Sequence, residues 1–259
     1  MISSDQLASE LDTGFPQTYV GLMATELDKK QQGGNNVSAF LQKVARTPAP
    51  LKAGKRGRLV FALDATGSRE PTWDQAMHTQ AEMFAVTRDV GGLDVQLCFF
   101  RGFGEFKASN WVSDPESLLH SMTGVRCLGG RTQIERVLRH GLRSTGEQKV
   151  NAIVFVGDCM EESVDTLCHL AGQLGLKGTP LFLFQEGYDP VAGTAFRQMA
   201  KLSGGAWCQF DAGSVDQLRE LLSAVAAFAA GGRKALADLS GKGGKEAVRL
   251  ISNQMTGRG

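Results

Sequence analysis

The sequence predicts an α/β fold with a doubly wound, Rossmann-like, mostly parallel six-stranded sheet that has one antiparallel edge strand and helices on both faces. Two observations predict it. From Arg58 to about residue 230, apolar runs of strand length alternate with segments of helix length. The strand-length runs are continuously apolar, which is typical of parallel strands covered by helices on both faces. A chain of 259 residues that is 42% hydrophobic can bury such a core unaided.

Six segments are expected to form the strands: residues 58–64, 93–102, 106–114, 151–157, 180–185 and 206–212. The second and third are separated by a very short connection, so these two are expected to pair antiparallel. Longer, helix-length segments separate the others, as parallel pairing requires.

Helices are expected to fill the intervals between the strands. Capping residues mark several of their starts, at Thr72, Asp114, Thr132 and Ser214. The expected helices cover residues 72–90, a short stretch from 115, 132–144, 163–176, 191–204 and a last segment from 214. The last one has an apolar face at helical spacing, which is expected to belong to the core: Leu218, Leu221, Leu222, Val225 and Phe228.

The two ends of the chain differ in composition from the region between them. Residues 1–57 contain QQGGNN, TPAP and a basic stretch, which are typical of linkers, and NNVSAFLQKVA between them can form a short helix. We expect an N-terminal arm over 1–57, either packed on the domain or flexible. The α/β domain is expected over 58–230, and a C-terminal tail with a hinge and a short helix over 231–259.

Bulk properties exclude several classes of function. The net charge of +1 gives no electrostatic case for binding nucleic acid or an anionic membrane. The polar start is unlike a signal peptide, and no apolar run approaches the roughly 20 residues that span a bilayer. The five cysteines include no Cys-x-x-Cys pair, no His/Cys spacing suggests zinc, and the cysteines are expected to be buried and reduced. We therefore expect a cytoplasmic protein.

Oxygen-bearing side chains follow two of the expected strands, where ligands of such sheets bind. The first strand ends in Asp64-Ala65-Thr66-Gly67-Ser68, in which a carboxylate and two hydroxyls alternate. Thr132 follows Gly129-Gly130-Arg131, and Asp158 ends the strand over 151–157. Oxygen donors of this kind suit Mg²⁺ or Mn²⁺. We expect a metal site on the surface at this edge of the sheet.

These motifs, in this order, resemble the metal-ion-dependent adhesion site of von Willebrand factor A domains, and the resemblance covers about residues 58–230. It implies that Asp64 anchors the ion, partly through water, and that Thr66 and Ser68 ligate it directly. It also implies that Thr132 ligates it in a high-affinity state and that Asp158 holds a coordinating water.

The resemblance also implies a function without catalysis. In family members an Asp or Glu of a partner protein fills the open position on the ion, and the last helix shifts in some of them. Intracellular bacterial members often act as adaptors beside AAA+ ATPases or chaperone-like machines. We therefore expect a metal-dependent protein-interaction domain, and no enzyme.

The sequence departs from the family pattern at two places. Thr66 stands where the family has a serine, and Gly157-Asp158-Cys159 replaces Thr-Asp-Gly. Glu161 and Glu162 follow, and we expect both to be solvated, although ligating the ion or repelling an acidic partner are alternatives. Arg69 and Trp73 could form the rim of the site, although Trp73 is more often a helix-packing residue.

Plainer interpretations exist for the same residues. The turn after the first strand contains only residues that suit turns. Thr132 and Glu135 also form a capping box, and Asp158 could be the N-cap of the helix that follows it. A domain with a decayed site, which binds partners without metal, is therefore a further hypothesis.

A rival hypothesis makes the protein an enzyme. Asp64-Ala65-Thr66-Gly67-Ser68 also resembles the Asp-Lys-Thr-Gly-Thr phosphorylation motif of the haloacid-dehalogenase-like superfamily, which implies Asp64 as a nucleophile that forms an aspartyl phosphate. Thr132 would then bind the phosphate, and Asp158 would belong to the acidic Mg²⁺ motif. Against this, Thr66 stands where the phosphatases of that superfamily have an acidic residue. Lys149, the nearest candidate for their lysine, starts the strand that Asp158 ends and so lies at the wrong edge.

Overall fold

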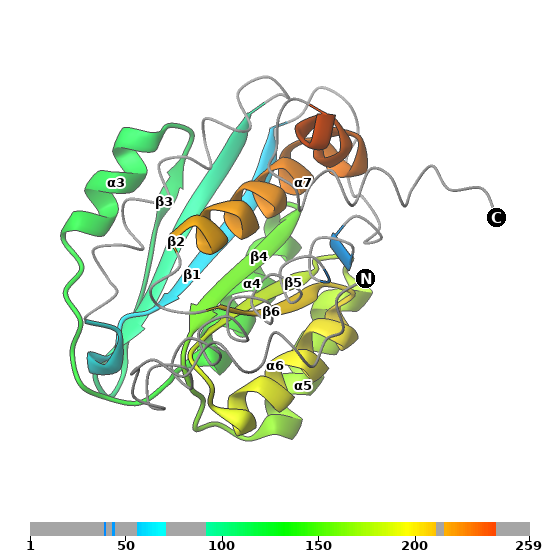
Figure 1. Cartoon of the computed structure of the whole chain (residues 1–259). Helices are drawn as coiled ribbons and strands as arrows, with labels where there is room; N and C mark the ends of the chain where they lie inside the picture. The colour runs from blue at the N-terminus through cyan, green and yellow to red at the C-terminus, as the bar shows by residue number, and fades with distance from the viewer. Residues whose placement is uncertain (1–38, 40–42, 45–55, 71–91, 211–214, 242–259) are drawn as a thin grey trace, which may run out of the picture.

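The computed structural model describes residues 39, 43–44, 56–70, 92–210 and 215–241. It contains one six-stranded sheet in the order β3-β2-β1-β4-β5-β6 (Figure 1). Its strands are β1 Gly57–Asp64, β2 Leu93–Arg101, β3 Glu105–Val112, β4 Ala152–Gly157, β5 Leu181–Glu186 and β6 Ala206–Phe210. All neighbouring pairs are parallel except β2 with β3. The predicted fold class is confirmed.

The described helices are η1 Gly67–Arg69, α3 Pro115–Thr123, α4 Ile134–Glu147, α5 Val164–Leu176, α6 Pro190–Ser203 and α7 Val215–Gly241. Asp114 caps α3 as predicted, because its side chain accepts a hydrogen bond from the Ser117 N–H at 2.8 Å. The expectation that Thr132 caps α4 is wrong, because the N-cap of this helix is Gln133. The N-cap of α5 is Ser163, so the alternative interpretation of Asp158 as its cap is also wrong. The helix expected over 72–90 lies outside the described residues.

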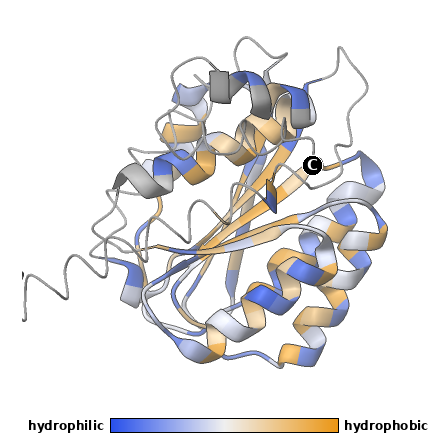
Figure 2. Ribbon diagram, turned by 45° about the vertical axis from the view of Figure 1, so that its right-hand side comes forward, coloured by the Kyte–Doolittle hydropathy of each residue, from blue (hydrophilic) through white to orange (hydrophobic). Residues whose placement is uncertain are grey.

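Alternating side chains of each central strand pack in two hydrophobic cores, one on each face of the sheet. In β1, Leu59, Phe61 and Leu63 belong to one core, whereas Val60 and Ala62 belong to the other. Helices α3 and α7 cover the first face, and α4, α5 and α6 cover the second. Apolar residues therefore lie between the layers and hydrophilic ones on the outer helix faces (Figure 2).

Parts of both chain ends belong to this framework. Ala39, Lys43 and Val44 are helical, and Val44 is fully buried in the core under α7. Helix α7 is interrupted at Gly232, whose φ of 67° and ψ of −156° are not helical. This break lies in the stretch that was expected to form a hinge. None of the helices in the described ranges has the length and apolar character that crossing a membrane requires.

The strand order reverses between β1 and β4. The chain moves from β1 to β2 and β3 on one side, and then returns to place β4, β5 and β6 on the other. Leu63 of β1 is paired with Val156 of β4, so the two strands end side by side. In doubly wound sheets this switch point is where ligands bind. The fold therefore brings Asp64 and Asp158 to the same place.

The first residue of β1 sets how closely α7 can pack. A Cβ on Gly57 would overlap the carbonyl oxygen of Ala229 in α7. We predict that Gly57→Ala lowers the free energy of unfolding by about 2 kcal/mol, because α7 must move away from the sheet. Gly146→Ala, at an open position in α4, is the matched control and should raise it by about 0.5–1 kcal/mol. Urea denaturation measures both, and an unchanged Gly57→Ala variant would contradict the close contact.

Candidate metal centre

Asp64 is the last residue of β1, and its side chain is fully buried. Its Oδ1 accepts a hydrogen bond from the Thr66 backbone N–H at 2.8 Å. Its Oδ2 is buried and has no hydrogen-bond partner within the described part of the chain. The hydroxyl oxygens of Thr66 and Ser68 lie 3.2 Å apart. One turn therefore holds a carboxylate and two hydroxyls close together.

Asp158 directly follows β4, the parallel neighbour of β1. Its Oδ1 is also buried and lacks a hydrogen-bond partner among the described residues. Burial raises the pKa of Asp64 from 3.8 to about 6; the hydrogen bonds from Thr66 oppose this rise, and the charge of Asp158 adds to it. The two strand ends are in contact, because a Cβ on Gly157 would lie 3.4 Å from Asp64 Cβ. Two poorly solvated carboxylates thus lie at adjacent strand ends.

Thr132 is held by the two glutamates after β4. Its hydroxyl donates to Glu162 Oε2 at 2.5 Å and accepts from the Glu161 N–H at 2.9 Å, and its own N–H donates to Glu161 Oε2 at 3.0 Å. Glu162 Oε1 accepts from the N–H of Ile134, the first residue of α4. Glu161 is exposed, as expected. The expectation that Glu162 is merely solvated is wrong, because Glu162 supplies the carboxylate that the free N–H groups of α4 favour. To ligate a metal, Thr132 would have to leave Glu162.

Arg69 does not form an exposed rim, contrary to expectation. Its side chain is 1% exposed and forms an ion pair with Glu186, the last residue of β5. Desolvation lowers the pKa of Arg69, while the charges of Asp158 and Asp64 raise it. Sequence reasoning missed Glu186 because the strand was expected to end one residue earlier. The sequence does contain a signal for this residue, because Glu186 is an acidic residue directly after the apolar run PLFLFQ. Trp73 lies outside the described residues.

The expected surface location is wrong for most of the proposed ligands. Asp64, Thr66 and Thr132 are 0%, 5% and 6% exposed. Gly67 and Ser68, in contrast, are exposed. Asp158 is half-buried, so solvent reaches these residues from the side of Gly67, Ser68 and Asp158.

Main-chain hydrogen bonds join the loops around these residues. The Ala65 N–H donates to the Phe100 carbonyl at 3.0 Å, and the Leu128 N–H donates to the Ala65 carbonyl at 3.0 Å. The N–H of Gly102 donates to the Leu128 carbonyl at 3.2 Å, and the N–H of Arg131 donates to the Gly102 carbonyl at 3.1 Å. The turn after β1, the turn after β2 and the loop before α4 therefore form one connected platform.

The donors at this edge fit a hard divalent cation. Asp64 and Asp158 each have a buried oxygen without a partner in the described chain, and Thr66 and Ser68 offer hydroxyls in the same turn as Asp64. The described ranges contain no group of three or more His, Cys, Asp or Glu side chains suited to a metal, so hydroxyls or waters would have to complete the coordination of any ion bound here. Burial, with the charge of Asp158 as a further cause, raises the pKa of Cys159 to about 12, so its thiol is protonated at neutral pH.

Comparison with known proteins identifies the fold. No family model and no curated protein matches the chain. The VWA domain of SpRpn10 matches over 66% of this chain and 94% of its own, with 12% identity and a TM-score of 0.51. An aerotolerance-related membrane protein from Bacteroides fragilis matches over 64% and 96%, with 15% identity and a TM-score of 0.50. Proximal thread matrix protein 1 from the mussel byssus matches with 16% identity and a TM-score of 0.55 over 68% of this chain, which spans only 48% of that protein. The chain has a von Willebrand factor A-like fold.

The buried charge of Asp64 predicts a pH-dependent stability. Between its ordinary pKa of 3.8 and about 6, the folded state holds a proton that the unfolded state has lost, so this group destabilises the fold as pH rises through that window. Without divalent cations, Asp64→Asn should be more stable than wild type at pH 8 by on the order of 2 kcal/mol, and equally stable at pH 4. Urea denaturation in EDTA measures the difference.

Asp114 provides a control of opposite sign. Hydrogen bonds from Ser117 lower the pKa of this exposed cap. Relative to wild type, Asp114→Asn should therefore be less stable at pH 8, and this difference should be smaller at pH 4. If Asp64→Asn gives no gain at pH 8, the Asp64 charge is already compensated in the metal-free protein.

The cap supplied by Glu162 gives a second prediction. Glu162→Gln should lower the free energy of unfolding by about 1 kcal/mol, because it weakens charged hydrogen bonds to Thr132 and to the start of α4. Glu135→Gln, which removes an exposed ion pair with Arg139 and a first-turn carboxylate that bonds no N–H of α4, should change it by about 0.5 kcal/mol or less. Equal losses in the two variants, measured by urea denaturation, would show that Glu162 has no special role.

Proposed function

We propose that this domain binds partner proteins through a Mg²⁺ or Mn²⁺ ion and does not catalyse a reaction. Asp64, Thr66, Ser68 and Asp158 would hold the ion at the switch point between β1 and β4. When bound, the ion would offer an open position to an Asp or Glu side chain of the partner. The observation that supports this most strongly is the pair of buried carboxylate oxygens, on Asp64 and Asp158, that lack partners in the described chain.

The electrostatic balance also supports a divalent ion. Three carboxylates, those of Asp64, Asp158 and Glu186, lie close enough to act on or pair with the buried guanidinium of Arg69. One guanidinium cannot neutralise three ionised carboxylates, and unpaired buried charge is costly. A divalent cation bound beside the two aspartates would neutralise the excess negative charge.

Thr132 has a conditional role in this proposal. Its hydroxyl is bonded to Glu162, so it would join the ligands only in a state in which that hydrogen bond is broken. The partner class that the family resemblance offers, AAA+ ATPases and chaperone-like machines, is the proposed place to search.

A metal-free interaction domain is the second candidate, and one observation favours it. Arg69 already places a positive charge near Asp64 and Asp158. The phosphatase hypothesis has less support. Lys149 donates to the carbonyls of Lys177 and Gly178, beyond the amino-terminal edge of the sheet.

The test is a thermal-shift titration with Mg²⁺ and Mn²⁺ on wild type, Asp64→Ala and Thr132→Ala, with phosphate release from a generic phosphate ester followed on the same samples. We expect the melting temperature of wild type to rise by several degrees, because a ligand of the folded state stabilises it by mass action. Asp64→Ala should lose the response and Thr132→Ala should weaken it, with no phosphate released.

Two outcomes would contradict the proposal. No response to either cation in wild type would favour the metal-free domain. Release of phosphate that Asp64→Ala abolishes would instead make Asp64 a nucleophile.

A further inference from the structure

Two exposed apolar side chains lie on the platform beside the candidate metal centre. Phe103, in the turn between β2 and β3, is 85% exposed, and Leu128, in the loop before α4, is 53% exposed. Leu128 is bonded through its N–H to Ala65, the residue after Asp64, and through its carbonyl to Gly102, the residue before Phe103. Exposed aromatic and aliphatic residues next to a binding centre are typical anchors of protein interfaces.

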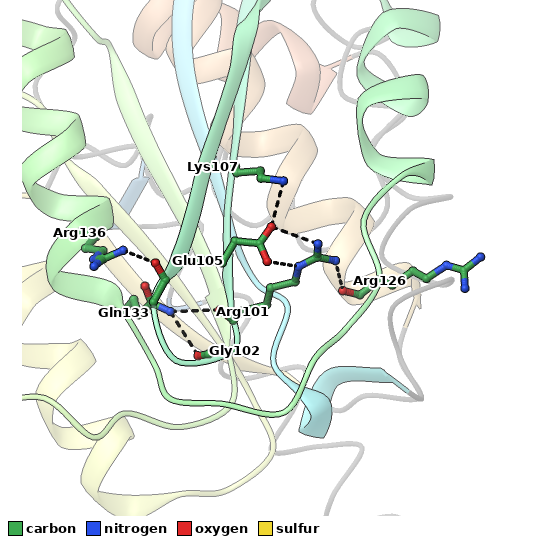
Figure 3. A network of polar contacts seen from close by, with 8 residues as sticks. Arg101, Gly102, Glu105, Lys107, Arg126, Gln133 and Arg136 are labelled. Carbon is green, nitrogen blue, oxygen red and sulfur yellow. Dashed lines mark hydrogen bonds and ion pairs between the residues drawn. The ribbon is translucent and has the colours of Figure 1, made fainter.

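Arg131 and Arg136 contact the same turn, and Arg126 belongs to the loop that contains Leu128; all three are exposed. The backbone N–H of Arg131 donates to the Gly102 carbonyl at 3.1 Å, and the guanidinium of Arg136 donates to the Gly104 carbonyl at 2.6 Å. The carbonyl of Arg126 accepts a hydrogen bond from Arg101, while the Arg126 side chain points away from this network (Figure 3).

Nearby carboxylates do not neutralise these three arginines. Glu105 is bonded to Arg101 at 2.8 Å and to Lys107 at 3.0 Å (Figure 3). Glu135 is paired with Arg139 at 2.7 Å. Among the described residues, no ion pair involves Arg126, Arg131 or Arg136.

Two exposed acidic residues lie near this surface. Glu161 is bonded to Thr132, the residue after Arg131. Glu70, in the first loop, adds to the rise of the Cys127 pKa, which burial mainly causes. The surface as a whole is nevertheless apolar and positively charged, which makes it complementary to an acidic segment that also carries an apolar side chain.

We infer that Phe103, Leu128, Arg126, Arg131 and Arg136 form an apolar–basic rim that binds an acidic peptide segment of the partner protein. In this segment an apolar residue stands beside the carboxylate that occupies the metal centre. Phe103 and Leu128 contact the apolar residue, and the arginines bind further acidic residues. The inference rests on the proposed function, because the metal centre supplies the anchor from which the segment reaches the rim.

The experiment uses the full chain and a displayed library of random 12-residue peptides, selected in Mg²⁺ and in EDTA. An enriched peptide is then synthesised with a fluorescent label, and its affinity is measured by anisotropy. We expect enriched peptides to contain Asp or Glu next to Phe, Leu or Trp. Phe103→Ser and Leu128→Ser should each weaken binding about fivefold or more. The triple variant Arg126→Gln/Arg131→Gln/Arg136→Gln should weaken it about tenfold at low salt and less at high salt.

Matched controls lie at the opposite edge of the sheet. Leu176, at the end of α5, is 92% exposed, and Arg143, in the second half of α4, is also exposed. Leu176→Ser and Arg143→Gln should leave the affinity for the peptide unchanged. Equal losses in the controls and in the rim variants would overturn the rim.

Asp64→Ala and EDTA separate the two proposals. Binding that needs Mg²⁺ and Asp64 but is unchanged in every rim variant would overturn the rim and leave the proposed function intact. If EDTA and Asp64→Ala leave the affinity for the peptide unchanged but the rim variants lose it, the rim proposal stands and the metal anchor is overturned. Enrichment of no peptide, or displacement of the peptide by a 12-nucleotide single-stranded DNA, would overturn the rim.

Discussion

The parallel pairing of β1 with both β2 and β4 is the constraint on which the site depends. Every residue of β1 is buried, so polar side chains that bind a ligand can reach solvent only at the end of the strand and in the turn after it. Because β4 runs parallel beside it and ends at the same level, Asp158 arrives next to Asp64. Phe100 of β2 and Leu128 of the loop before α4 are then hydrogen-bonded to Ala65, the residue that follows Asp64. The arrangement of the whole edge follows from the position of one central strand.

This arrangement concentrates negative charge where water cannot easily reach it. Isolated buried carboxylates are costly, and the fold offsets part of that cost locally. Arg69 pairs with Glu186 and acts on both aspartates, while Thr66 donates to Asp64. The rise of the Asp64 pKa to about 6 shows that the compensation is incomplete. Incomplete compensation is common at sites that are built to receive a ligand.

Local patterns in the sequence were enough to predict the strands, their antiparallel edge pair and the Asp114 cap, because each depends on neighbouring residues. The same reasoning failed where a distant residue takes over a local role. The capping box of Thr132 and Glu135 is sound by pattern, yet Glu162 provides the cap because its carboxylate reaches α4 from another loop. Arg69 follows a polar turn and is a candidate for the rim of the site by pattern, but a glutamate at the end of β5 makes its burial possible. Contacts between the ends of different strands depend on the tertiary structure, and no short segment of the sequence predicts them.

The platform at the carboxyl edge is joined through main-chain groups, and this has a consequence for how such a domain can diversify. A hydrogen bond from the Leu128 N–H to the Ala65 carbonyl, or from the Arg131 N–H to the Gly102 carbonyl, does not depend on which side chain the donor carries. Phe103, Leu128 and Arg131 can therefore be exchanged with little change in the backbone that supports them, since exposed substitutions usually alter stability by less than about 0.5 kcal/mol. If these side chains form the proposed rim, stability and partner preference depend on different atoms of the same loops. Random mutation would then redirect the proposed interaction to a new partner by changing exposed side chains alone, without first passing through unstable intermediates.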